Sequence, residues 1–229
     1  DPSTPWRTLD KLNSFKNFVA GDNILFKRGD TFYGSITVSN TGRSGNPITY
    51  AAYGSGAKPI ITGFTSVTSW TNKGFNIWES TNAVSDLSTL KLVLINGVNT
   101  PMGRYPNGSS SYPYLPNFFY FQSHTGTGLG STSITSNSLT DGNNWTGADV
   151  VVRVNQYTLD RATITGQSGT TLSYTGEAGT IADGWGFFIQ NDTRTLDAQN
   201  EWYYNPSTKK LRIYSTTEPT DVKVTTVDT

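Results

Sequence analysis

Residues 21–26 read Gly-Asp-Asn-Ile-Leu-Phe and residues 45–50 read Gly-Asn-Pro-Ile-Thr-Tyr, so a glycine and an isoleucine recur at an offset of 24. The same offset places residues 34–37 on residues 58–61. Two matches at one offset predict two coils of a solenoid, because a repeat of short strands must stack on a neighbour to bury its face. The alternative is that Gly-x-x-Ile recurs by chance in a glycine-rich β protein.

The residues before this repeat predict one amphipathic helix over roughly 5–19. Thr4 is suited to the N-cap and Pro5 to the first helical position, and Gly21 stops the pattern. The apolar residues between them recur at helical spacing: Trp6, Leu9, Leu12, Phe15 and Val19.

After the repeat the sequence predicts a β-rich region with long irregular loops. Short apolar runs bounded by Gly, Asn and Pro are typical of strands, whereas residues 108–147 are expected to form loops. We expect strands within residues 24–26, 31–33, 36–38, 90–95, 149–159, 161–165, 170–174, 185–190, 201–204 and 211–214.

Composition excludes several classes of protein. The chain has 229 residues, of which 35 are Thr, 23 Ser and 19 Asn, and charged residues make up only 15% against about 25% in typical domains. A formal net charge of +0 provides no basic surface for nucleic acid or an anionic membrane. Neither partner is therefore expected, nor is membrane insertion, since no apolar run approaches about 18 residues.

The absence of Cys excludes thiol chemistry and zinc–thiolate sites, and the single His124 excludes a multi-histidine metal site. The chain begins at Asp1 without an initiator Met or a signal region, so we expect it to be a mature or trimmed piece of a longer protein.

Several strings resemble the start of a secreted bacterial right-handed parallel β-helix protein of the pectate-lyase-like superfamily. They are Pro-Trp-Arg-Thr-Leu-Asp-Lys-Leu-Asn at 5–13, Gly-Asp-Asn-Ile-Leu-Phe-Lys-Arg-Gly-Asp at 21–30, and Asn-Pro-Ile-Thr-Tyr at 46–50 with Tyr53-Gly54. The resemblance implies an all-β fold in which residues 1–63 form a capping helix and the first β-helix coils.

A second group of strings resembles the β-sandwich-like insertion of some β-helix glycosidases and lyases. It comprises Asn96-Gly97, residues 103–107, Asn-Glu-Trp-Tyr-Tyr at 200–204 and Leu-Arg-Ile-Tyr at 211–214. This resemblance implies an inserted antiparallel β-domain over 64–217 and a return strand towards the β-helix over 218–229. The active groove is then expected beyond residue 229.

One aromatic segment has the residue types of a carbohydrate site, in which flat rings stack on sugar and polar groups bond its hydroxyls. We assign as candidate carbohydrate-binding residues Tyr112, Tyr114, Phe118, Tyr120 and Arg104. The alternative is that these rings pack the loop onto the domain.

No catalytic residue is assigned. Glycoside hydrolysis requires two carboxylates, and β-elimination a base with a cation. The residues near aromatic strands that could supply these groups are Arg104, Asp160, Arg161, Asp192, Asp197 and Glu201, each of which could equally be a turn residue or a surface ion pair. His124 is expected to be solvated. We expect no cofactor; residues 141–144, Asp-Gly-Asn-Asn, offer only a weak pattern for Ca²⁺.

Together these features predict the N-terminal part of an extracellular polysaccharide-degrading protein, a lyase or a glycoside hydrolase, with polysaccharide as its partner. We expect it to be monomeric, and secreted or displayed at the cell surface. The alternatives are a non-catalytic carbohydrate-binding or adhesin-like β-helix protein, and a purely structural cap that prevents end-to-end association of solenoids.

Overall fold

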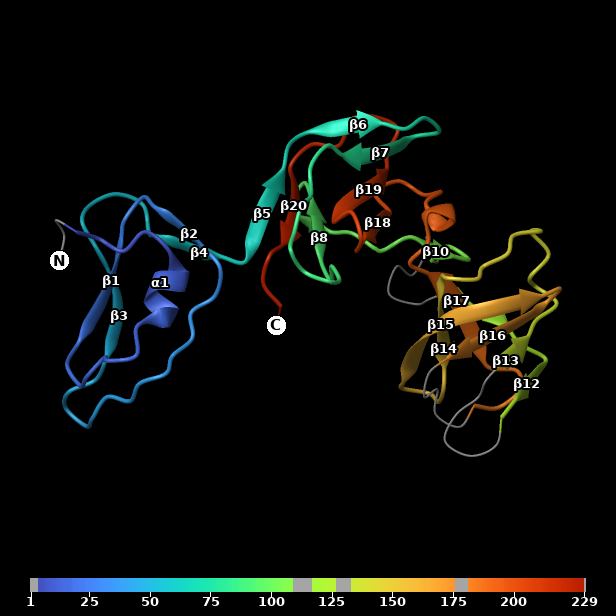
Figure 1. Ribbon diagram of the computed structural model, residues 1–229, viewed down its shortest axis with the longest axis horizontal. Helices are drawn as coiled ribbons and strands as arrows, with labels where there is room; N and C mark the ends of the chain where they lie inside the picture. The colour runs from blue at the N-terminus through green and yellow to red at the C-terminus, as the bar shows by residue number, and fades with distance from the viewer. Residues whose placement is uncertain (1–3, 109–116, 127–132, 176–180, 229) are drawn as a thin grey trace.

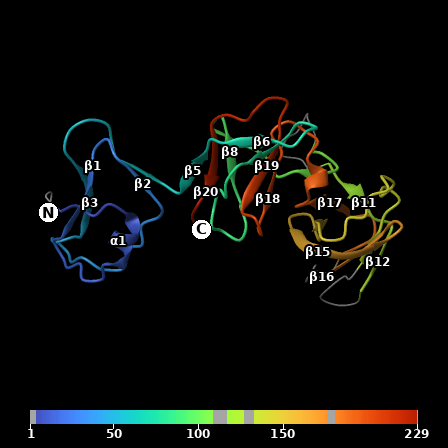
Figure 2. The same cartoon turned by 45° about the horizontal axis from the view of Figure 1, so that its top comes forward.

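The computed structural model describes residues 4–108, 117–126, 133–175 and 181–228. These residues form a β protein with three buried clusters of apolar side chains. Both views show three groups of elements along the longest axis: α1 with β1–β4, a middle group around β5, β8 and β20, and a group around β14–β17 (Figures 1 and 2).

The first group contains two parallel strand pairs. β1 (Asn23–Lys27) pairs with β3 (Thr49–Tyr53), and β2 (Thr31–Tyr33) pairs with β4 (Ile60–Thr62). Asn23 lies opposite Thr49 and Thr31 opposite Ile60, so the expected offset of 24 is wrong. The offset increases along the pair because the connection between β3 and β4, residues 54–59, is longer than that between β1 and β2, residues 28–30. The expected strand at 36–38 is absent from the described structure.

The N-terminal helix is shorter than the sequence predicts. α1 spans Leu9–Ser14, with Thr8 rather than Thr4 as its N-cap, and Phe15 is already extended. The side chain of Asn13 explains the early end, because its amide donates to the Ser35 carbonyl at 2.9 Å and accepts from the Thr37 N–H at 2.9 Å. These bonds tie the last turn of the helix to an extended segment.

The buried cluster beneath α1 is small, consisting of Leu9, Leu12 and Phe26 with partly buried neighbours. Beside it a shallow apolar cavity of about 380 Å³ is lined by Phe26, Ile36, Val38, Tyr50, Ala51, Pro59 and Ile61. Leu25, Ile60 and Ile61 are exposed. The two parallel pairs are the extent of parallel sheet in the described residues, so neither a parallel β-helix nor a helix that caps one is shown.

The middle group consists of two four-stranded antiparallel sheets with one common core. The first has the order β5–β20–β8–β9 and the second β18–β19–β7–β6. The strands are β5 (Phe64–Val67), β6 (Trp70–Asn72), β7 (Ile77–Ser80), β8 (Val93–Ile95), β9 (Val98–Asn99), β18 (Trp202–Asn205), β19 (Lys210–Tyr214) and β20 (Val222–Thr225). Both sheets contribute side chains to the core, including Val93, Ile213 and Val224.

The chain returns through β20 to the point where it entered the middle group. β20 pairs antiparallel with β5, and just past it the Thr226 N–H donates to the Gly63 carbonyl at 2.7 Å. Residues 222–225 are thus integral to the middle sheet.

The third group is an eight-stranded antiparallel sheet with the order β10–β17–β14–β15–β16–β13–β12, in which β11 also pairs with β17. Its largest fully buried side chains include Trp145, Phe121 and Phe187. The strands are β10 (Arg104–Tyr105), β11 (Phe119–Tyr120), β12 (Ser123–Thr125), β13 (Ser133–Thr135), β14 (Asp149–Arg153), β15 (Leu159–Ser168), β16 (Thr171–Thr175) and β17 (Gly186–Gln190).

Two segments that run side by side connect the middle and third groups. The outgoing segment, residues 100–104, and the returning segment, residues 190–202, bond through Gly103 N–H to the Trp202 carbonyl at 2.9 Å. Gly103 has no room for a side chain, because a Cβ there would lie 2.7 Å from Thr195 Oγ1 and 2.9 Å from Leu196 Cδ2. The returning segment includes the single-turn η1 (Thr193–Thr195).

We expect Trp202→Phe to lower the free energy of unfolding by about 2–3 kcal/mol, because it removes a buried hydrogen bond and leaves a cavity. The Trp202 indole N–H donates to the Thr100 carbonyl at 2.8 Å, and the side chain is buried. Urea unfolding measures the change. The control is Trp6→Phe, which should lose less stability because Trp6 is half-exposed. An equal loss in the two variants would contradict the role assigned to the buried Trp202 indole.

Candidate functional site

Strand alternation gives the eight-stranded sheet two different faces. Phe187 and Ile189 of β17 point into the buried core, whereas Phe188 and Gln190 point to the opposite side. In register with them, Arg104 lies opposite Gln190, and Val151 opposite Phe188. We call this side the second face and define it by Arg104, Phe118, Tyr120, Asp149, Val151, Arg161, Phe188 and Gln190.

An arginine and two phenylalanines form one end of the second face. The Arg104 guanidinium carbon lies 3.7 Å from the centroid of the Phe188 ring, and the Phe118 ring is 5.9 Å from the same ring. Arg104 Nε donates to the Pro106 carbonyl at 2.9 Å, and a second guanidinium nitrogen donates to the Asn117 carbonyl. Main-chain acceptors therefore fix the plane of the guanidinium over the ring.

Burial lowers the pKa of Arg104 to about 10, and the nearby Glu201 carboxylate acts in the opposite direction. Arg104 remains a cation at neutral pH.

A polar network continues the second face across the neighbouring strands. Arg161 donates to Gln190 Oε1 at 2.9 Å and lies 3.7 Å from the Asp149 carboxylate. The Asn191 amide donates to the same carboxylate oxygen, with its Nδ2 at 3.2 Å from Asp149 Oδ2. The second face thus combines aromatic rings with guanidinium, amide and carboxylate groups.

The structure brings together part of the predicted carbohydrate site. Arg104 and Phe118 meet over Phe188, and Tyr120 lies two residues further, opposite Gly186, with 56% of its surface exposed. Tyr112 and Tyr114 fall outside the described residues. Phe188 and Gln190 were not among the predicted site residues, although their alternation with Phe187 and Ile189 was a signal that could have separated the two faces.

Glu201 lies beneath this site and has an unusual environment for a carboxylate. It is buried, and its Oε2 accepts the backbone N–H groups of Asp197 at 3.2 Å and Ala198 at 3.1 Å. Burial raises the pKa of Glu201 to about 7, although the N–H groups of Asp197, Ala198 and Arg104 partly oppose the rise. Glu201 therefore joins β10 to the returning segment through main-chain bonds.

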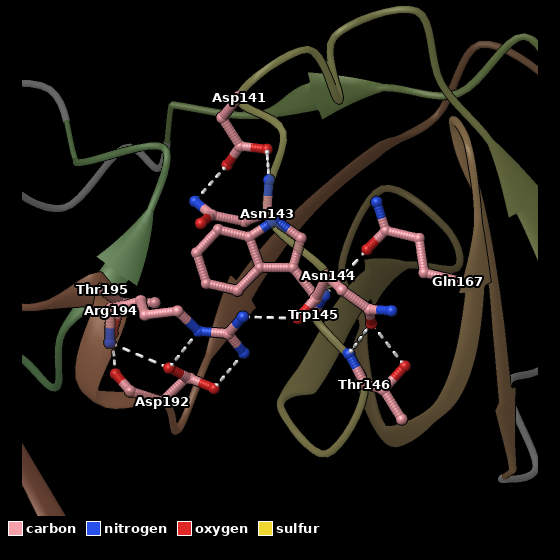
Figure 3. Close-up of polar contacts among 9 residues, drawn as sticks. All are labelled: Asp141, Asn143, Asn144, Trp145, Thr146, Gln167, Asp192, Arg194 and Thr195. Atoms are coloured by element: carbon pink, nitrogen blue, oxygen red, sulfur yellow. Dashed lines mark hydrogen bonds and ion pairs between the residues drawn. The ribbon is translucent and has the colours of Figure 1, made fainter.

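A second cluster holds the returning segment against the third group (Figure 3). Arg194 binds both carboxylate oxygens of Asp192, with Nε at 2.8 Å and a terminal nitrogen at 2.6 Å, and also donates to the Asn144 carbonyl. Its guanidinium carbon lies 4.7 Å from the centroid of the Trp145 ring, whose plane is stacked with that of Tyr105. Burial raises the pKa of Asp192, but the Arg194 bonds outweigh it and hold the pKa below its usual value.

Asp141 and its neighbours, the weak candidate for Ca²⁺, make local turn contacts. The Asp141 carboxylate accepts the Asn143 N–H at 3.1 Å and its Nδ2 at 2.9 Å (Figure 3). Within the described ranges, no three His, Asp or Glu side chains gather in a way that could hold a metal ion.

The structure overturns the expectation that His124 is solvated. His124 lies on β12, is half-buried, and its Nδ1 is 2.6 Å from Asp183 Oδ1. No local pattern indicates this contact, because the two residues are 59 positions apart.

Three of the acidic residues considered as catalytic candidates form hydrogen bonds or an ion pair within the protein. Asp192 binds Arg194, Asp197 accepts from Asn107 Nδ2 at 2.8 Å, and Glu201 accepts main-chain N–H groups. Arg161 belongs to the second face, and Asp160 precedes it on β15, opposite Val152.

Comparison with solved structures finds a protein described as a glycoside hydrolase that superimposes on this chain with a TM-score of 0.66 and 14% sequence identity. The match covers 92% of this chain and 39% of that protein, so this chain spans well under half of its length. At this identity the likeness concerns the fold. No family model matches the sequence, and no curated protein matches it. No helix among the described residues is long and apolar enough to span a membrane.

We expect Glu201→Gln to flatten the dependence of stability on pH. Because the pKa of Glu201 is raised, the folded protein holds a proton that the unfolded chain loses near its ordinary pKa of 4.5. The wild-type free energy of unfolding should therefore fall as pH rises from about 4.5 to about 7, by roughly 1–2 kcal/mol from this residue. Urea unfolding at several pH values measures the slope. Glu218→Gln, on an exposed loop, should keep the wild-type slope, and an unchanged slope in Glu201→Gln would contradict the assignment.

We expect Arg194→Lys to destabilise the fold by about 1–2 kcal/mol although it preserves the charge. Lysine cannot reproduce the two parallel bonds to Asp192 together with the planar contact on Trp145. Thermal unfolding of this variant beside Arg43→Lys, at an exposed position, provides the comparison. Equal unfolding midpoints for the two variants would show that the paired bonds from the Arg194 guanidinium to Asp192 do not contribute to stability.

Proposed function

We propose that this chain is part of an extracellular carbohydrate-active protein that binds polysaccharide on the second face of its eight-stranded sheet. The observation that carries the proposal is the exposed Tyr120 ring on the same side of the sheet as Arg104, Phe118 and the amide of Gln190, with the buried Phe188 ring as their support. Rings that take the apolar side of a sugar, with fixed polar groups at their edge, are the usual composition of carbohydrate sites. The fold likeness to a protein described as a glycoside hydrolase supports the same class of ligand.

The proposal extends to a β-helix parent. The parallel pairs β1–β3 and β2–β4, and the exposed apolar residues beside them, support the interpretation of residues 1–63 as the first coils of a right-handed parallel β-helix. The antiparallel sheets between Phe64 and Thr225 support an inserted β-domain over 64–217. The bond from Thr226 to Gly63 supports a returning segment over 218–229.

In this proposal the reacting groups of a lyase or glycoside hydrolase belong to another part of the protein, and these residues contribute to binding. The engaged states of Asp192, Asp197 and Glu201 support that division. They equally favour the second candidate, a non-catalytic carbohydrate-binding or adhesin-like surface protein. Secretion and a monomeric state remain predictions of either candidate.

Tyr120→Ala should weaken polysaccharide binding about tenfold without lowering stability, because the exposed ring would contribute stacking rather than core packing. Affinity electrophoresis in gels containing polygalacturonate, alginate, dextran or mixed-linkage β-glucan measures the retention. Val98→Ala, at an exposed hairpin position of the middle group, is the control and should be retained like the wild type. Retention of Tyr120→Ala equal to that of the wild type would contradict the second face as the binding site.

The same polysaccharides separate the two candidate functions when incubated with the complete natural protein. A lyase releases an unsaturated product that absorbs ultraviolet light, and a hydrolase releases reducing ends without that absorbance. Binding with neither product would favour the adhesin-like protein.

A further inference from the structure

The hairpin between β6 and β7 exposes a large apolar ring at a strained position. Gly74, Phe75 and Asn76 have φ angles of 84°, 51° and 62°, and the Phe75 side chain is 96% exposed. Gly and Asn adopt left-handed backbone conformations readily, but a phenylalanine does so at an energetic cost. Because the ring is almost fully exposed, packing within the protein does not offset that cost, and folding alone gives no reason for a phenylalanine here.

The neighbouring residues impose this conformation from both sides of the turn. Asn72 Oδ1 accepts the Gly74 N–H at 2.7 Å, and the Ile77 N–H donates to the Gly74 carbonyl at 2.9 Å. On the far side, the Ser215 N–H donates to the Asn76 carbonyl at 2.7 Å. The hairpin tip is therefore a fixed support that presents the ring with little loss of backbone entropy on binding.

Amide and hydroxyl groups predominate around the hairpin tip, and Lys73 is the one charged residue among residues 72–76. Asn76 Nδ2 donates to the Tyr214 hydroxyl at 3.0 Å, and Asn72 lies at the other side of the turn. The nearest cation along the turn, Lys73, lies 3.9 Å from Glu79, which also accepts from Arg212.

We propose that Phe75 is a carbohydrate-stacking subsite that takes the apolar face of one pyranose ring, with Asn72, Asn76 and Tyr214 beside it to bond the hydroxyls. This inference rests on the proposed function but assigns a contact on the middle group, separate from the second face. A sugar offers one small apolar face ringed by hydroxyls, which matches a single ring with a polar rim. A stable protein interface needs about 800 Å² of surface on each partner with an apolar centre, whereas beyond the Phe75 ring the sheet continues with the half-buried Ile77 and Tyr214.

The decisive variant is Phe75→Gly, because glycine removes the ring and also relieves the backbone strain. We expect about five- to tenfold weaker retention by the polysaccharides that the wild type binds, with a thermal unfolding midpoint equal to or above that of the wild type. Phe75→Tyr keeps a ring and should bind like the wild type. Tyr157→Ala, which removes a 94% exposed ring in the third group, is the matched control and should leave retention unchanged.

Each other result would overturn a defined part of this inference. Wild-type retention of Phe75→Gly, with Tyr120→Ala still impaired, would reject the subsite and leave the proposed function intact. A wild-type chain retained by none of the four polysaccharides would reject both. A lower unfolding midpoint for Phe75→Gly would show that the ring stabilises the fold. Self-association of the wild type in analytical ultracentrifugation that is lost in Phe75→Gly would identify a second copy as the occupant.

Discussion

The double connection between the middle and third groups is the constraint on which the rest of the structure depends. Two segments about a hundred residues apart in sequence lie side by side there, bonded through Gly103 and Trp202. A side chain at Gly103 would separate them. Because β10 begins at Arg104, immediately after this contact, the position of the guanidinium over Phe188 follows from the connection. The second face is in this sense built from the junction outwards.

Polar groups with several partners hold this junction together; Glu201 is buried, whereas Asp192 is half-buried and Arg194 is exposed. Arg194 neutralises Asp192 and covers the Trp145 ring, while Glu201 accepts main-chain N–H groups. Such groups stabilise little by their charge alone, because desolvation cancels much of the attraction. Their effect is geometric, since a carboxylate or guanidinium with several fixed partners permits few alternative arrangements of the two segments. The apolar cores on either side supply most of the stability.

The sequence allowed the all-β class, four of the eight strands of the third group (β14–β17) and the candidate residues Arg104, Phe118 and Tyr120 to be predicted, because these depend on local patterns. The expectation of loops over 108–147 was wrong at β11, β12 and β13, because strands of two or three residues leave too short a pattern to recognise. The predicted offset of the parallel pairs was wrong because the lengths of the connecting loops set it, and periodicity does not reveal those lengths. The helix ended early because Asn13 bonds a segment more than twenty residues away. The partner of His124 could not be predicted because Asp183 is distant in sequence. Alternation within 186–190 could have placed Phe188 on the face opposite the core, but not the strand neighbours that complete the second face.

The bond between Thr226 and Gly63 has an evolutionary and practical meaning. The two ends of the segment from Phe64 to Thr225 lie side by side, because β20 pairs with β5 and the flanking residues Gly63 and Thr226 share a hydrogen bond. Chain ends that lie this close together are typical of segments that tolerate insertion into another chain. Under the proposed inserted domain, the segment and the parallel-stranded part could therefore be exchanged independently, with a join of very few residues.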